Sequence, residues 1–359
     1  MKKNIVLFIP SIEGGGVEKN FFLITNYLSK KHKKIFVVTA DTRYKKFFNK
    51  KTFLICPKSK KWEKKSRIIK TFISIFLLIK YFNTKKLIII SFQANISSIL
   101  ISKIFGYKII IRLNTSLKKY INSTIKKYFF KFFYNLADEI IVNSNYFKNE
   151  IKKFLNLKPV LIYNLIQNSR KRKMIKYFKN FNGLKILNIG RLTDQKDQIT
   201  LLKALKLLLI KNVSFKCCII GSGVNNKLLK NYINTEKLNN SVKLLGYKKK
   251  AENYLSSSDL FVLTSKYEGS PNVLIEAQSK NVPIISSDCP TGPKEILLNG
   301  KLGDLFKVGD YKKLFFLLQD FSRDKRKLIN KSKNSKKYLK RFNLNSNCEK
   351  YNKTISNYL

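Results

Sequence analysis

Short apolar runs recur along this chain, and amphipathic segments separate them. Residues 5–9 are apolar throughout, residues 17–28 place apolar side chains at 17, 21, 24 and 28, and residues 35–38 are apolar again. A fully apolar run of four to eight residues is typical of a strand buried on both faces, and the 3.6-residue spacing is typical of a helix. Strand, helix and strand in this order predict a βαβ unit, and therefore a parallel sheet covered by helices.

The same alternation continues to residue 163, pauses, and begins again. Further strands of the first half are predicted at residues 87–91, 108–111, 139–142 and 160–163. The polar, basic segment 167–182 is predicted to be a linker. The second half predicts helices at 198–210 and 225–235 and strands at 185–189, 215–220, 242–245, 260–263 and 283–286. We therefore expect an α/β protein with two doubly wound, Rossmann-like domains, at residues 1–170 and 183–340, that bind ligands at the carboxyl ends of their strands.

Composition adds a strong basic excess to this picture. The chain has 359 residues, is 44% hydrophobic and carries a formal net charge of +52, which suits a folded protein with two cores. Only nine of its 73 basic residues are Arg. Most of the lysines are expected on a solvated surface, and their excess also suits an anionic membrane leaflet. A nucleic-acid-binding protein is the alternative, although such proteins lean on Arg.

The cysteines and the apolar runs bear on location. Five Cys residues, at 56, 217, 218, 289 and 348, form no C-x2-C pair, which indicates a reducing compartment and no metal site. The apolar run near Met1 is too short for a signal peptide. No later run reaches the roughly 18 apolar residues that span a bilayer. We expect a cytoplasmic protein that is peripheral on the inner face of the cell membrane.

Residues 267–277 combine two acids with the start of a helix. Ser270 is a favourable N-cap and Pro271 suits the first helical position. A helix start offers free backbone N–H groups to a phosphate. The carboxylates of Glu268 and Glu276 can accept hydroxyl groups. Together these groups match the needs of a nucleotide-linked sugar.

Two further motifs follow predicted strands. Gly14, Gly15 and Gly16 follow the first strand, and glycine permits the close approach of a ligand to the backbone. Arg191 and Lys196 follow the strand at 185–189, where fixed cations can stabilise a leaving nucleoside diphosphate. The chain has no Asp-x-Asp pair to hold a divalent metal. We therefore expect metal-independent chemistry with no cofactor, the sugar nucleotide being a substrate.

These motifs carry a family resemblance. The run EGSPNVLIEA resembles the Glu-x7-Glu donor-site signature of retaining glycosyltransferase family 4. The glycine loop 14–16, the segment 190–192 with Lys196, and the loop 289–296 agree in order and spacing. The resemblance is strong over residues 185–303, and the last loop is similar to that of enzymes that build bacterial surface glycans and lipid-linked oligosaccharides. It implies a GT-B fold, with two domains facing across a cleft and a tail helix at 341–359 crossing back to the first domain.

The resemblance also implies an activity and a set of roles. It implies a hexosyltransferase that moves a sugar from a nucleoside diphosphate, UDP being expected, to a glycan or polyprenyl-linked acceptor in cell-surface polysaccharide biosynthesis. Glu268, Arg191 and Lys196 would be catalytic, and Glu276 would receive the ribose hydroxyls. The remaining donor contacts would come from Gly15, Gly16, Gly269, Ser270, Pro271 and Asn272. A phosphorylase on the same fold is a further alternative, but the chain shows no motif for its pyridoxal phosphate lysine.

The first domain departs from the family pattern. Many members carry a His in a loop that faces the acceptor, whereas the only His here is His32, in a basic run expected at the surface. The matching region, 111–115, offers Arg112 and Asn114 as acceptor-side candidates. Residues 117–136 then mix Lys with Tyr and Phe at helical spacing. They predict either a helix with a buried aromatic stripe and a solvated basic face, or an interfacial helix on anionic lipid.

Overall fold

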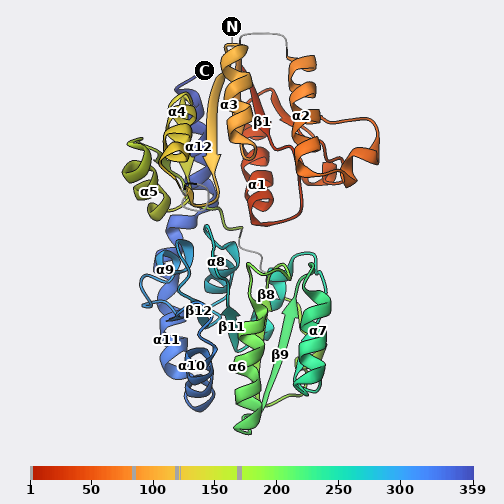
Figure 1. The fold of residues 1–359 in the computed structure, drawn as a ribbon, viewed down its shortest axis with the longest axis vertical. Helices are drawn as coiled ribbons and strands as arrows, with labels where there is room; N and C mark the ends of the chain where they lie inside the picture. The colour runs from red at the N-terminus through yellow and green to blue at the C-terminus, as the bar shows by residue number, and fades with distance from the viewer. Residues whose placement is uncertain (1–2, 83–85, 118–120, 122, 168–171) are drawn as a thin grey trace. The chain divides into compact units, whose positions relative to one another are not determined.

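The chain forms two compact α/β units, and in Figure 1 the first is coloured red to yellow with a blue C-terminal helix, and the second green to blue. The computed structural model describes residues 3–82, 86–117, 121, 123–167 and 172–359. The first unit comprises Met1–Leu165 and Asn343–Leu359, and the second comprises Ile166–Phe342. Positions 168–171 of the expected linker lie outside the described residues.

The first unit is built on a seven-stranded sheet whose strands are all parallel. In spatial order its strands are β3 (Thr52–Ile55), β2 (Ile35–Val38), β1 (Asn4–Phe8), β4 (Leu87–Ser91), β5 (Lys108–Leu113), β6 (Glu139–Val142) and β7 (Val160–Leu161). The central strands are buried on both faces, as their apolar sequences predict. The edge strand β3 was not predicted, because three of its residues are only half-buried, Phe53 is exposed, and the strand follows two lysines.

Helices cover both faces of this sheet. One face packs against α2 (Arg67–Tyr81), α3 (Asn95–Ile104), α4 (Thr124–Asn135) and α5 (Asn145–Leu155). The other face packs against α1 (Gly16–Lys31) and the C-terminal α12 (Leu344–Ser356), which lie against each other. His32 lies at the end of α1 and is half-buried, with Nε2 at 2.8 Å from Asn352 Oδ1 of α12.

The second unit repeats this architecture with a six-stranded parallel sheet. Its strands, in spatial order, are β10 (Val242–Leu244), β9 (Phe215–Ile220), β8 (Leu184–Ile189), β11 (Leu260–Leu263), β12 (Ile284–Ser287) and β13 (Asp304–Phe306). Its helices are α6 (Gln198–Ile210), α7 (Asn226–Thr235), α8 (Asn272–Ser279), α9 (Gly292–Ile296), α10 (Tyr311–Arg323) and α11 (Arg326–Asn334). Strand order reverses at β8, which pairs with β9 on one side and β11 on the other. In such sheets, ligands bind outside the strand ends at this reversal.

One helix start differs from the one predicted. Helix α8 begins at Asn272, and Pro271 is its N-cap with extended backbone (φ −70°, ψ 105°), so Ser270 is not the cap. Helix α9 begins at Gly292, with Pro293 in its first turn. In both places the loop backbone around proline decides where the helix begins. Across the described residues, no helix is both long enough and apolar enough to cross a bilayer.

Candidate functional site

The loops that follow β8 and β11 are held together at the strand-order reversal. The backbone N–H of Lys266 donates to the Gln195 carbonyl at 2.8 Å, and Gln195 Nε2 donates to the Tyr267 carbonyl at 3.0 Å. The Thr264 hydroxyl donates to the Lys196 carbonyl at 2.9 Å. These bonds fix the backbone on either side of Lys196 and Glu268 before any substrate is bound.

Lys196 and Glu268, 72 residues apart in sequence, meet in an ion pair. The Lys196 ammonium contacts Glu268 Oε1, and the Ser265 hydroxyl donates to the same oxygen at 2.6 Å. The Lys196 and Glu268 side chains are 15% and 7% exposed. Among the residues that the structure describes, no hydrogen bond reaches Glu268 Oε2. The pair therefore has one carboxylate oxygen available to a hydroxyl, and ammonium hydrogens available to an anion.

Arg191 lies at the rim of this cluster. Its guanidinium is exposed, and Nη2 donates to Gln195 Oε1 at 3.3 Å. Gln198 Nε2 donates to the Arg191 carbonyl at 3.0 Å, which anchors the backbone. The geometry thus connects the three residues predicted to be catalytic through Gln195. Sequence reasoning missed Gln195, although its place just after a strand end is a signal for such a role.

A third loop supports the turn that follows Glu268. The Thr291 hydroxyl contacts the Glu268 carbonyl and lies 3.2 Å from the carbonyl oxygen of Gly269. A Cβ at Gly292 would stand 2.4 Å from the Gly269 carbonyl oxygen and 2.4 Å from Pro271 Cδ. Only glycine fits this approach without a shift of the backbone. The loop after β12 therefore positions the predicted donor turn.

Glycine also permits the close packing of the loops after β8 and β9. A Cβ at Gly223 would stand 2.2 Å from the Leu192 carbonyl oxygen, and one at Gly221 would stand 1.8 Å from the Gly190 carbonyl oxygen. Residues 190–192 are thus pressed against the glycine turn 221–223. This contact holds the backbone of Arg191 at the strand end.

The remaining predicted donor residues of this unit lie on the same turn and helix. Gly269, Ser270 and Asn272 are half-buried, Pro271 is buried, and Glu276 is half-buried within α8. The neighbouring Cys289 is buried, and its burial together with the Glu268 carboxylate raises the pKa of the thiol to about 12. At neutral pH the site therefore holds a protonated thiol beside its carboxylate.

The predicted glycine loop belongs to the first unit. Gly14 has φ +79°, and Gly15 is the N-cap of α1. A Cβ at Gly15 would stand 2.9 Å from Glu18 Oε2. Glu18 is itself buried, and this burial raises the pKa of its carboxyl group. The loop thus closes over an acid of its own helix.

Arg112 lies inside the first unit, with 1% of its surface exposed. Its Nη2 donates to Asn164 Oδ1 at 2.7 Å, its Nη1 contacts Asn114 Oδ1, and its guanidinium lies 5.5 Å from the centre of the Phe92 ring. Asn114 is half-buried and donates to the Phe92 carbonyl at 3.0 Å. The acceptor-side role of both residues stays a prediction.

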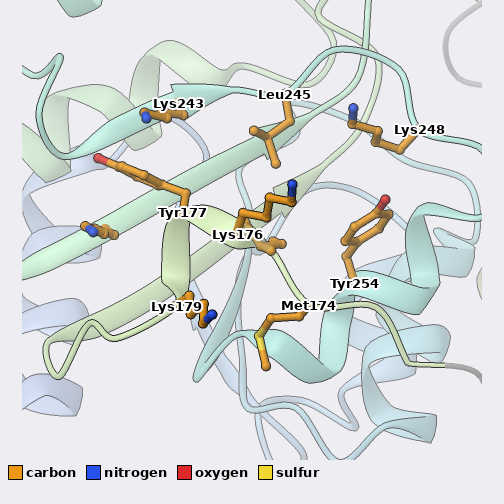
Figure 2. Close-up of a pocket in the computed structure, with 10 residues that line it drawn as sticks. Met174, Lys176, Tyr177, Lys179, Lys243, Leu245, Lys248 and Tyr254 are labelled. Atoms are coloured by element: carbon orange, nitrogen blue, oxygen red, sulfur yellow. The ribbon is translucent and has the colours of Figure 1, made fainter.

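A separate basic cavity of about 690 Å³ lies against the β9–β10 edge of the second unit (Figure 2). It is lined by Met174, Ile175, Lys176, Tyr177, Lys179, Lys216, Lys243, Leu245, Lys248 and Tyr254, and by none of the predicted donor residues. The Lys216 and Lys243 ammonium groups lie 4.6 and 4.2 Å from the centre of the Tyr177 ring. Both lysines therefore make a cation–π contact within the protein.

Comparison with known proteins agrees with this geometry. The family model described as "Glycosyl transferases group 1" matches residues 169–341. An uncharacterized glycosyltransferase of Methanocaldococcus jannaschii is 34% identical over 282 residues, which cover 72% of this chain and 69% of that protein. The N-acetylgalactosamine-N,N'-diacetylbacillosaminyl-diphospho-undecaprenol 4-alpha-N-acetylgalactosaminyltransferase of Campylobacter jejuni is 25% identical over 226 residues, covering 60% of this chain and 61% of the relative.

The whole fold has solved counterparts. The structure of Anabaena HepE in complex with UDP-glucose superposes with a TM-score of 0.79 at 17% identity, covering 99% of this chain and 100% of that one. This likeness covers both units, whereas the family model covers only the second, where the Lys196–Glu268 pair lies. The chain, with two parallel-sheet Rossmann-like units of GT-B type, belongs to the glycosyltransferases.

Proposed function

We propose that this glycosyltransferase moves a hexose, with retention of configuration, from UDP to a hydroxyl group of a lipid-linked glycan. The observation that carries the proposal is the Lys196–Glu268 ion pair where the loops after β8 and β11 meet. A cation for the diphosphate and a carboxylate for the sugar are the two groups that a nucleotide sugar requires. Both stand at the strand ends where such sheets bind ligands.

The proposed reaction breaks the bond between the anomeric carbon and the β-phosphate oxygen. The electron pair stays on the phosphate, where Arg191 and Lys196 stabilise the developing charge. Glu268 Oε2 and the turn 269–272 hold the sugar hydroxyls, and Glu276 accepts the ribose hydroxyls. The acceptor hydroxyl attacks from the face that the phosphate leaves, and its proton passes to the leaving phosphate oxygen. This route retains configuration and uses no metal.

The first unit supplies the remaining proposed contacts. Gly15 and Gly16 present backbone to the pyrophosphate, since glycine permits the close approach of a ligand to the backbone. Arg112 holds Asn114 toward the acceptor side. The printed name of the Campylobacter relative specifies an alpha linkage and a diphospho-undecaprenol acceptor. These words support retention and a lipid-linked acceptor here, and with them a role in surface polysaccharide synthesis by a protein peripheral to the inner face of the membrane.

The donor is identified first by ligand-induced stabilisation. Purified protein is heated with UDP-, GDP- and ADP-hexoses, and the UDP-sugars are expected to raise the Tm most, because binding to the native state alone stabilises it. In the Glu268→Gln variant, free UDP should raise the Tm as much as in wild type. The additional rise in Tm that the sugar of the UDP-hexose produces should be lost. A preference for GDP- or ADP-sugars would overturn the donor assignment.

The stereochemistry is tested on the product. With an α-linked UDP-hexose and a polyprenyl diphosphate saccharide, NMR of the new linkage should show the α anomer, and added EDTA should leave the rate unchanged. A β product would refute retention. A rate that falls with EDTA and returns with Mg²⁺ would refute metal independence.

A further inference from the structure

Helix α4 is apolar on two sides, and only one of them has a partner among the described residues. Its inner side packs into the core of the first unit through Phe130, Phe133 and Tyr134. Its outer side carries apolar residues at the i, i+3, i+4 and i+7 spacing of a single helix face, each between 45% and 82% exposed: Ile125, Tyr128, Phe129 and Phe132. A solvated helix would carry polar residues at these positions. A contiguous exposed apolar stripe of this kind marks an interaction surface.

Two neighbouring helices continue this surface. On α2, Ile68, Phe72 and Phe76 follow one another at i, i+4 and i+8 and are between 64% and 70% exposed. On α3, Leu100 and Ile104 are exposed. All three helices pack into the same core on one side of the sheet, and α3 contacts α4. Their exposed apolar residues are here together termed the apolar face.

The charges on these helices are all of one sign. The sequences of α2, α3 and α4 contain no Asp or Glu. Exposed lysines stand on these helices, with Lys80 on α2 and Lys126 and Lys131 on α4, whereas the exposed Lys103 of α3 pairs with Asp138 at 3.3 Å. Lysine stems lie along apolar surface while their ammonium groups reach outward to phosphates. A surface of apolar residues and lysines, on helices that carry no acid of their own, complements an anionic lipid leaflet, and two copies of it would repel each other.

We propose that the apolar face docks this enzyme on an anionic lipid leaflet, with its Phe and Tyr rings at the headgroup boundary and its lysines on the lipid phosphates. The structure extends the surface well beyond residues 117–136, of which 118–120 and 122 lie outside the described residues. The inference deepens the proposed function and rests on it for the acceptor, a lipid-linked saccharide held in the same leaflet.

The first test is vesicle co-sedimentation of the full chain. One variant combines Phe72→Gln, Phe76→Gln, Phe129→Gln and Phe132→Gln, and the control combines Leu228→Gln and Phe316→Gln, which remove exposed apolar residues from the second unit. On phosphatidylcholine vesicles with about 30% phosphatidylglycerol, the first variant should bind more than about tenfold more weakly than wild type, and the control within about twofold. Thermal melts should be unchanged, since all the altered side chains are exposed. Equal losses in the two variants, or none in either, would overturn the proposal.

The second test separates insertion of the rings from diffuse attraction by the net charge of +52. Phe132→Trp is made in a Trp62→Phe background, with Phe316→Trp as the matched control. Anionic vesicles should shift the emission of the indole introduced at position 132 to the blue, brominated lipid should quench it, and the effect should persist at about 0.5 M salt, which screens distant charges. No shift at position 132, or sedimentation showing that a second copy covers this face, would overturn the proposal.

The third test distinguishes failure of docking from failure of the proposed function. The four-Phe variant should transfer sugar normally to a water-soluble saccharide and more than about tenfold more slowly to a lipid-linked one in vesicles. Equal rates on the lipid-linked acceptor would refute docking alone. Wild-type protein that binds vesicles but transfers sugar to neither acceptor would refute the proposed function and leave the docking surface intact.

Discussion

Each unit holds a lysine–carboxylate pair near the carboxyl edge of its sheet, and the two pairs differ in burial and in saturation. In the first unit, Lys70 Nζ lies 2.9 Å from both oxygens of Asp41, and the two side chains are 5% and 0% exposed. Asp41 also accepts from the Ile12 N–H at 2.7 Å and from Arg43 Nη2 at 3.0 Å. In the second unit, Lys196 and Ser265 both contact Glu268 Oε1.

The difference shows how the same chemistry serves two purposes. The Asp41 oxygens are fully engaged by the chain, so that pair holds the loop before Gly14 in place. The Glu268 carboxylate is engaged on one side and is more accessible, so it can hold a substrate as well. Burial and unused hydrogen-bonding capacity, rather than residue type, therefore distinguish a structural pair from a candidate catalytic one.

The largest expected effect is on transfer. Glu268→Gln and Lys196→Ala should each lower kcat/KM by about a thousandfold or more, because they remove groups aimed at the reacting sugar phosphate. The Lys206→Ala control removes a lysine whose pair with Glu236 is half-exposed at 3.5 Å, and it should keep the wild-type rate. Initial rates with a radiolabelled donor measure both. Near-normal transfer in either site variant would contradict the assignment of Lys196–Glu268 as the catalytic pair.

The next effect is on stability. Lys70→Met leaves the buried Asp41 without its ammonium partner and should lower the free energy of unfolding by about 3–5 kcal/mol. The control, Lys103→Met, breaks an ion pair with Asp138 in which the lysine is 39% exposed, and it should cost less than about 1 kcal/mol. Urea unfolding measures both. Similar losses of unfolding free energy in the two variants would mean that the buried Lys70–Asp41 pair stabilises the fold no more than an exposed pair does.

A smaller effect is expected at Gly292. A Cβ there would press on the Gly269 carbonyl and on Pro271, so Gly292→Ala should cost about 1–3 kcal/mol and slow transfer by shifting the turn after Glu268. Gly309 has a positive φ, but a Cβ added there would meet nothing within 4 Å, so Gly309→Ala should cost about 1 kcal/mol with transfer unchanged. Transfer rates and urea unfolding of both variants decide whether the loop positions the site.

The smallest effect concerns Glu18, a buried acid that makes no ion pair with a lysine among the described residues. Burial raises its pKa in the folded state, so folding binds a proton and stability falls as pH rises above the ordinary value of 4.5 toward the raised pKa. The stability of Glu18→Gln relative to wild type should therefore grow as the pH rises above 4.5. Urea unfolding across this range measures it, and a gap that narrows with rising pH would show that ionised Glu18 is stabilised instead.

Much of the second unit was predictable from its sequence. The strands Phe215–Ile220 and Leu260–Leu263 and the helix Gln198–Ile210 have the predicted bounds, because short strands buried on both faces and a long, largely apolar helix leave little choice. The cap of α8 was missed, because the contact of Gly292 with the turn is not visible in local sequence. The first unit was harder to predict from its sequence. Its edge strand is partly exposed, and several of its helices carry apolar residues on their outer sides, so the simple rule that apolar residues are buried fails there.

By itself, the sequence determined the α/β class, the two parallel sheets and the motif residues of the donor site, because these depend on local periodicity and on residue type. Tertiary structure alone decided which residues meet. It paired Lys196 with Glu268 across 72 positions, placed Arg112 in the interior, and left Phe72, Phe76 and Phe132 exposed on α2 and α4. The reason is physical: periodicity shows that a helix has an apolar face, but only packing shows which faces the protein itself covers.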